Sequence, residues 1–188
     1  MNDRTHMNGD QPGWLSTYTD PVLRLSAPLS WTILRNNLYT DFVVQGLAGA
    51  LASGALVATA GDGAVAYVTR EDCARAAAAA LAADDHERRV LDITGPAALT
   101  QTELAALASE FGGRPVRYTP VDPATQRARL AGFGVPAPFV EALVGFDLAA
   151  ALGHLAVVSR DFQDLTGRPP TSVAEHLRAH RAALAPAS

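Results

Sequence analysis

Two patterns of apolar and polar positions alternate along the first two thirds of the chain. Helical spacing covers residues 41–53, 71–83 and 101–111, and glycines end the first and the third of these segments. Short β-rich runs occur between them, at residues 31–35, 55–60, 64–69, 90–94 and 116–121. Strands that alternate with helices predict an α/β fold.

The last third is different, because helical patterns dominate it. They cover residues 124–131, 137–155, 160–165 and 171–184, separated by glycine and proline. Earlier in the chain, Gly61-Asp62-Gly63 predicts a turn between two extended segments, and Thr100 with Glu103 fits a capping box. Residues 1–30 are polar and proline-containing, which predicts a loose, partly disordered leader before a domain at residues 31–184.

Composition narrows the possible chemistry. All 15 basic residues are arginine, so Schiff-base catalysis, a P-loop and a Tyr/Lys catalytic pair are excluded. The net charge of −4 comes without a basic patch, so we expect no nucleic-acid partner. The apolar run at residues 42–60 is interrupted by glycine and polar residues, so we expect no membrane span. One cysteine and no signal-peptide pattern predict a cytoplasmic protein.

Five short motifs follow one another in a familiar order: Trp31-Thr-Ile-Leu-Arg-Asn-Asn-Leu-Tyr39, Ala60-Gly-Asp-Gly63 with Val68-Thr-Arg-Glu-Asp72, Leu91-Asp-Ile-Thr-Gly-Pro96, Gly113-Arg-Pro-Val-Arg-Tyr118 and Leu165-Thr-Gly-Arg-Pro-Pro-Thr171. In this order they resemble the NmrA-like atypical short-chain dehydrogenase/reductase family, in particular its NAD(P)H:quinone oxidoreductase type 2 branch. The resemblance extends over roughly residues 31–181.

The resemblance implies the C-terminal portion of a Rossmann-like NAD(P)-binding fold with a helical substrate-side lobe. Family members begin with a strand, a glycine-rich turn and a helix that holds the dinucleotide pyrophosphate. Gly46-Leu-Ala-Gly49 lies within a predicted helix here, and Gly61-Asp62-Gly63 joins two extended segments. We therefore expect the N-terminal glycine-rich half to be missing and to come from another chain or from an upstream start.

The candidate cofactor site follows the first predicted strand and consists of Asn36, Asn37, Leu38 and Tyr39. Amides and backbone N–H groups there can donate to a phosphate, a nicotinamide or a quinone carbonyl, or can simply form a turn. Family members place this loop beside the cofactor. Arg70, at a predicted helix start, fits a phosphate or ribose clamp, or a surface salt bridge with Glu71 or Asp72. Arg35 has the same clamp role or anchors its strand.

Other reactive side chains give weaker signals. Tyr39 is the one weak catalytic candidate, and no lysine is present to lower its phenol pKa. His176 and His180 have the spacing of half a zinc site, but no other ligand accompanies them, so we expect two solvated histidines and no metal. Cys73 is expected to be a small buried residue.

Three functional hypotheses remain. The first is an NAD(P)H-dependent oxidoreductase of quinone reductase type, represented by its substrate-side half, with NADP or NAD as cofactor and a quinone-like substrate. A partner chain or a homodimer would complete it. The others are a non-catalytic, dinucleotide-sensing regulator and an inactive truncated remnant. The resemblance favours the enzyme.

Overall fold

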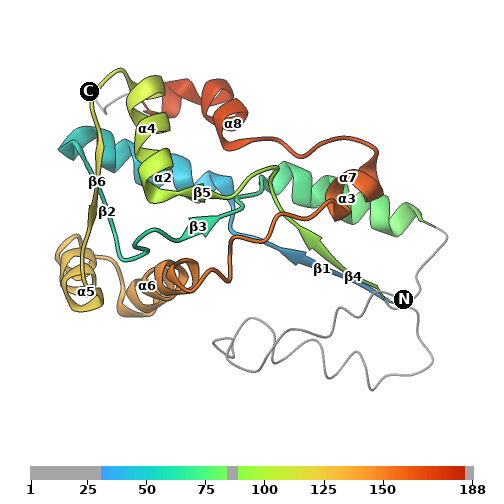
Figure 1. Cartoon of the computed structure of the whole chain (residues 1–188), viewed down its shortest axis with the longest axis horizontal. Helices are drawn as coiled ribbons and strands as arrows, with labels where there is room; N and C mark the ends of the chain where they lie inside the picture. Colours follow the sequence, from blue (N-terminus) through green and yellow to red (C-terminus); the bar gives the residue numbers. More distant parts are fainter. Residues whose placement is uncertain (1–30, 84–88, 185–188) are drawn as a thin grey trace.

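The structure is a computed structural model that describes residues 31–83 and 89–184 (Figure 1). The leader predicted for residues 1–30 lies outside the described residues. The strands are β1 (Thr32–Asn36), β2 (Ala55–Ala58), β3 (Ala64–Val65), β4 (Arg89–Ile93), β5 (Leu99–Thr100) and β6 (Arg117–Pro120). The helices are α2 (Thr40–Ser53), α3 (Arg70–Ala82), α4 (Gln101–Gly112), α5 (Pro123–Gly132), α6 (Ala137–Ala151), α7 (Asp161–Thr166), α8 (Val173–Ala179) and the 3₁₀ helix η1 (Arg181–Leu184).

The described strands form three separate pairs. β1 pairs with β4 in parallel, from Thr32 beside Arg89 to Asn36 beside Ile93, and β2 pairs in parallel with β6. β3 and β5 form a short antiparallel pair. Parallel strands joined through helices confirm the predicted α/β class. The glycine turn at residues 61–63 is present, but the extended segments on its two sides pair with different strands and not with each other.

Local signals set most helix ends. α2 ends at Gly54, whose φ of 76° is left-handed, and the Thr100–Glu103 capping box begins α4 as predicted. α6 is shorter than predicted, because Gly153 adopts a φ of 79° two residues after Ala151. The helix predicted at residues 171–184 consists of α8 and η1, and a second capping box, from Ser172 to Glu175, sets where α8 begins.

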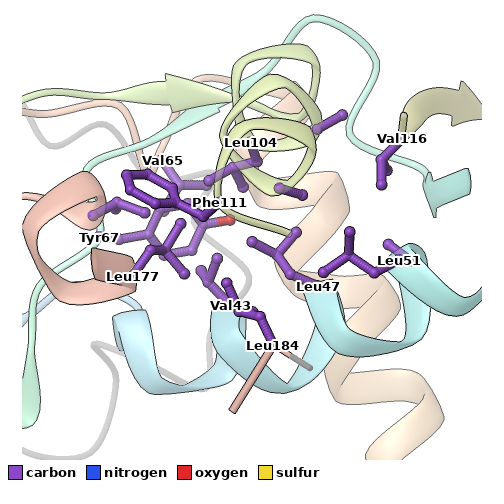
Figure 2. Close-up of a cluster of buried hydrophobic side chains, with 14 of the residues drawn as sticks. Val43, Leu47, Leu51, Val65, Tyr67, Leu104, Phe111, Val116, Leu177 and Leu184 are labelled. Carbon is purple, nitrogen blue, oxygen red and sulfur yellow. The ribbon is translucent and has the colours of Figure 1, made fainter. Parts of the chain in front are cut away.

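The larger hydrophobic core lies among α2, α4 and α8 (Figure 2). Leu47, Phe111 and Leu177 meet there, together with the ring of Tyr67 from the segment after β3. A smaller cluster lies between the β1–β4 pair and the helices α3 and α7, and contains Ile93 and Phe162. Both helices lie on the same side of this strand pair (Figure 1).

The helices α5 and α6 form the predicted lobe beside the β2–β6 pair (Figure 1). Gln126 of α5 donates to the carbonyl of Val57, and Asp147 of α6 accepts from the backbone N–H of Thr59 at 2.8 Å. No helix in residues 31–83 or 89–184 is long and apolar enough to cross a membrane.

Candidate functional site

The loop after β1 lies beside the start of α3. Val68 joins the two, since its N–H donates to the carbonyl of Leu38 at 3.0 Å and its carbonyl accepts from the N–H of Thr40 at 2.9 Å. Tyr39 and Val68 form a parallel bridge between these hydrogen bonds. The N-termini of α2 and α3 are therefore side by side, at the carboxyl edge of β1, where α/β folds bind ligands.

The two neighbouring asparagines of this loop have different surroundings. Asn37 is tied into the fold: its Nδ2 donates to the carbonyl of Leu155 at 3.0 Å, and its Oδ1 accepts from the N–H of Leu38 at 2.7 Å. The Leu155 carbonyl also accepts from the N–H of Ala66 at 2.9 Å, so Asn37 joins the loop to the segment after α6. The side chain of Asn36 is exposed. Asn36 is the amide of this loop that is open to a ligand.

Arg70 lies over two aromatic rings at the start of α3. Its guanidinium carbon is 5.4 Å from the ring centroids of both Tyr39 and Phe42, and these rings stack 6.2 Å apart at 17°. Such contacts stabilise a cation at a surface by about 0.5 to 1 kcal/mol. The acids predicted as possible partners, Glu71 and Asp72, both pair with Arg75 instead. Within the described ranges the Arg70 guanidinium has no carboxylate at ion-pair distance, so its charge is available to a ligand.

Arg35 lies in a different environment. Its Nε donates to one carboxylate oxygen of Asp92, and one of its terminal nitrogens donates to the other, each at 2.8 Å. Asp92 is the residue of β4 in register with Arg35. The N–H of Asp92 donates in turn to Asp161 of α7 at 2.8 Å. In this arrangement Arg35 anchors the end of β1, which is the second of the two roles predicted for it. The first role, a part in cofactor binding, stays a prediction.

Sequence reasoning did not single out Phe42 and Thr40, and it expected Asp72 at the surface, where the structure has it buried. Phe42, one turn into α2, is 52% exposed although it is a large apolar side chain. Thr40 is fully buried, and its Oγ1 has no hydrogen-bond partner among the described residues. Asp72 is 1% exposed and accepts from the N–H of Thr171 at 2.8 Å, which ties α3 to the segment before α8. For Phe42, the signal in the sequence was its position three residues after Tyr39.

The other reactive side chains that the sequence singled out are Cys73, His176 and His180. Burial, together with the charges of Asp72 and Asp41, raises the pKa of the Cys73 thiol to about 12, so this cysteine is not a ready nucleophile. His176 stacks on His180 with ring centroids 4.1 Å apart, and burial lowers the pKa of His176. No three potential ligands from His, Cys, Asp and Glu gather around one point in the described part of the chain.

A second polar cluster lies under α6. Burial raises the pKa of Asp147, whose carboxylate accepts from the N–H of Thr59. Burial also raises the pKa of Tyr67, to about 12, and that of Tyr118, and the charge of Asp147 contributes to both shifts. This cluster fixes the lobe to the end of β2.

A parallel strand pair, an amide-containing loop at its carboxyl edge and two helix N-termini beside it define part of a Rossmann-like nucleotide-binding fold. No protein-family model matches the chain. Quinone oxidoreductase 2 of Escherichia coli K12 is 34% identical over 145 residues, which are 77% of this chain and 51% of that protein. The NAD(P)H azoreductase of Xenophilus azovorans is 30% identical over 155 residues, covering 82% of this chain and 54% of the azoreductase.

Solved structures of similar reductases also match this chain. The E. coli NADPH-dependent quinone oxidoreductase in complex with NADPH matches with a TM-score of 0.80 and 31% identity, over 85% of this chain and 56% of that one. The Citrobacter triphenylmethane reductase in complex with NADP(H) matches with a TM-score of 0.75 and 36% identity, over 80% and 53%. The chain is thus homologous to NmrA-like atypical short-chain reductases of the quinone oxidoreductase type 2 branch, which confirms the resemblance. It spans about half the length of these relatives.

Proposed function

We propose that this chain is the substrate-side part of an NAD(P)H-dependent oxidoreductase that reduces planar, quinone-like acceptors. The observation that carries the proposal is the surface formed by Tyr39, Phe42 and Arg70 at the carboxyl edge of β1. Two relatives are named for quinone and azo reduction, and a structural neighbour is named a triphenylmethane reductase, and compounds of these classes carry conjugated rings. An exposed aromatic ring beside an unpaired cation is suited to such a molecule.

The groups around the loop also fit part of a dinucleotide. The exposed amide of Asn36 offers a donor and an acceptor for a carboxamide, and Arg70 offers paired N–H donors for a phosphate or a ribose. The buried hydroxyl of Thr40, at the start of α2, is a further polar group near the loop and has no hydrogen-bond partner among the described residues. When bound, NADPH or NADH supplies the hydride. The pyrophosphate would be held by a second part of the protein that carries a glycine-rich turn.

In this proposal the described residues orient the acceptor and stabilise the charge that it gains. A quinone becomes anionic at one oxygen when it accepts a hydride. The guanidinium of Arg70 stabilises that oxygen, and Phe42 holds the ring by stacking. Tyr39 holds Phe42 and Arg70 in position, because its ring contacts both and is itself partly buried against the smaller core cluster. Its use as a proton donor stays a weaker prediction.

The test measures the binding of menadione, a planar naphthoquinone, to the full chain by quenching of tryptophan fluorescence or by calorimetry. We expect Arg70→Gln and Phe42→Ala each to weaken binding about fivefold, the equivalent of about 1 kcal/mol. Arg114→Gln changes another exposed arginine, outside this surface, and is the matched control. Equal affinity of the Arg70 and Arg114 variants would refute the assignment of the site.

The cofactor requires a separate measurement. We expect the full chain alone to show negligible NADPH binding by calorimetry, because the pyrophosphate-binding turn belongs to the complementary part. Micromolar binding by the chain alone would show that this part is not essential. We also propose that the protein acts in the cytoplasm and that another polypeptide segment, in a partner chain or in a longer form of this one, completes the site.

A further inference from the structure

The segment between α6 and α7 crosses the carboxyl edge of the β1–β4 pair. Near its start, the carbonyl of Leu155 accepts from the side-chain amide of Asn37, the residue after β1, at 3.0 Å. Near its end, the N–H of Ser159 donates to Oγ1 of Thr94, the residue after β4, at 2.9 Å. Because β1 and β4 are neighbours in register, the two attachment points lie side by side. In Figure 1 this segment passes the ends of both strands before it reaches α7.

The residues between the two attachment points form what we call the arch, which consists of Ala156, Val157 and Val158. Neighbouring strands are about 4.8 Å apart, whereas four peptide units can span about 13 Å. The chain therefore has more length than it needs to join the two strand ends, and the arch bulges away from them. The side chains of Val157 and Val158 are 54% and 49% exposed, so the arch carries two neighbouring apolar groups at its surface.

The loop between β1 and α2 connects the arch to the surface formed by Tyr39, Phe42 and Arg70. Asn37 of this loop binds Leu155. Two positions further on, the ring of Tyr39 stacks with that of Phe42 and lies under the guanidinium of Arg70. Both surfaces therefore border the carboxyl edge of β1. One of them is aromatic and positively charged, and the other is aliphatic.

We propose that Val157 and Val158 form the aliphatic wall of the acceptor site and select quinones that carry an alkyl group on the ring. This inference rests on the proposed function, because it assigns the substituent-binding side of the same site. The quinone ring stacks on Phe42 and one carbonyl oxygen faces Arg70, while the alkyl group lies against the arch. The side chain of valine has no hydrogen-bond donor or acceptor, so a polar substituent at this wall would lose water without gaining a partner.

Two quinones test this selection, the unsubstituted 1,4-naphthoquinone and its 2-pentyl derivative. Their binding to the full chain is measured by calorimetry, and the readout is the ratio of the two dissociation constants. We expect the pentyl derivative to bind about tenfold more tightly to the unmodified chain, which corresponds to the burial of about two methylene groups. The ratio cancels any effect that a substitution has on the binding of the ring itself.

The variant that tests the arch combines Val157→Thr with Val158→Thr. Threonine has nearly the same shape as valine but places a hydroxyl in the wall, so the ratio should fall to about twofold. Val135→Thr makes the same change at a partly exposed valine in the turn between α5 and α6, and it should keep the ratio at about tenfold. Because Val157 and Val158 are exposed, their double variant should melt at the same temperature as the unmodified chain.

Three results would overturn the inference. These are an unmodified chain that does not prefer the pentyl derivative, a double variant that keeps the tenfold ratio, and a Val135→Thr variant that loses the ratio as well. A second copy of the chain that covered the valines would give the second result, together with a changed oligomeric state of the double variant in light scattering. If neither quinone binds, the proposed function is overturned too. If naphthoquinone binding depends on Arg70 while the ratio does not depend on the arch, only this inference is overturned.

Discussion

Replacing Asp72 by alanine should be among the most destabilising single changes in the α3 region. The carboxylate is buried, and it accepts one hydrogen bond from the N–H of Thr171 and one from Arg75. It therefore holds together two segments that are 99 positions apart in the sequence. Alanine would leave the Thr171 N–H without a partner and Arg75 with Glu71 alone.

The magnitude follows from these contacts. A hydrogen bond to a charged acceptor contributes about 1.5 to 3 kcal/mol, and we assign about 2 kcal/mol to the Thr171 bond. Arg75 is 39% exposed, so solvent screening limits its share to about 0.5 kcal/mol. An acid in the first turn of α3 adds about 0.5 kcal/mol through the helix dipole. The total is a loss of about 3 kcal/mol in the free energy of unfolding.

Urea unfolding followed by circular dichroism measures this loss. With a slope of about 2 kcal/mol per M, the midpoint of Asp72→Ala should fall by about 1.5 M. Asp72→Asn keeps an acceptor oxygen for Thr171 and should lose about half as much. Glu71→Ala is the matched control, because that acid is 72% exposed and pairs with the same arginine; it should cost about 0.5 kcal/mol or less. Equal midpoints for the two alanine variants would refute the role of Asp72.

Three further predictions concern other parts of the fold. Gly63→Ala should lower the free energy of unfolding by about 2 kcal/mol, because the new Cβ would lie 2.2 Å from the backbone of α6. Gly46→Ala, in open space on α2, should raise the free energy of unfolding by about 0.5 kcal/mol. Equal urea midpoints for the two variants would contradict this. Cys73 should react with Ellman's reagent at pH 8 at least about 100-fold more slowly in the native chain than in guanidinium, because its pKa of about 12 leaves little thiolate. Equal rates in the native and the unfolded chain would disprove the burial of this thiol. Burial raises the pKa of Asp147 above 3.8, so the contribution of this residue to stability falls as pH rises through the folded-state pKa. Asp147→Asn keeps an acceptor for the N–H of Thr59 and should gain stability over the unmodified chain from pH 4 to pH 7. A difference in the free energy of unfolding between the two chains that stays constant over this pH range would exclude the titration.

Features that depend on neighbouring residues in the sequence could be predicted. The end of α2 at Gly54 and the capping box at Thr100 and Glu103 are local, since each requires groups within four positions. The position of the loop between β1 and α2 was also predictable, because a strand followed by polar residues is a local pattern. The burial of Cys73 was predicted as well and is confirmed.

Features that depend on distant residues could not be predicted. The amide of Asn37 is bonded to a carbonyl 118 positions away, and the partner of Arg35 is 57 positions away. Nothing in the sequence near either residue distinguishes a ligand-binding side chain from one that is used internally. The partner strands of β2 and β3 were missed for the same reason, since strand pairing is set by the whole fold.

The shared acceptor at Leu155 has a consequence for motion. One carbonyl receives N–H groups from Asn37 and Ala66, so a displacement of the segment after α6 breaks both bonds in a single event. The loop at the end of β1 and the α5–α6 lobe are thereby mechanically linked. An outward movement of the lobe would therefore loosen the loop at the same time, and a contact that holds one of them in place would also rigidify the other.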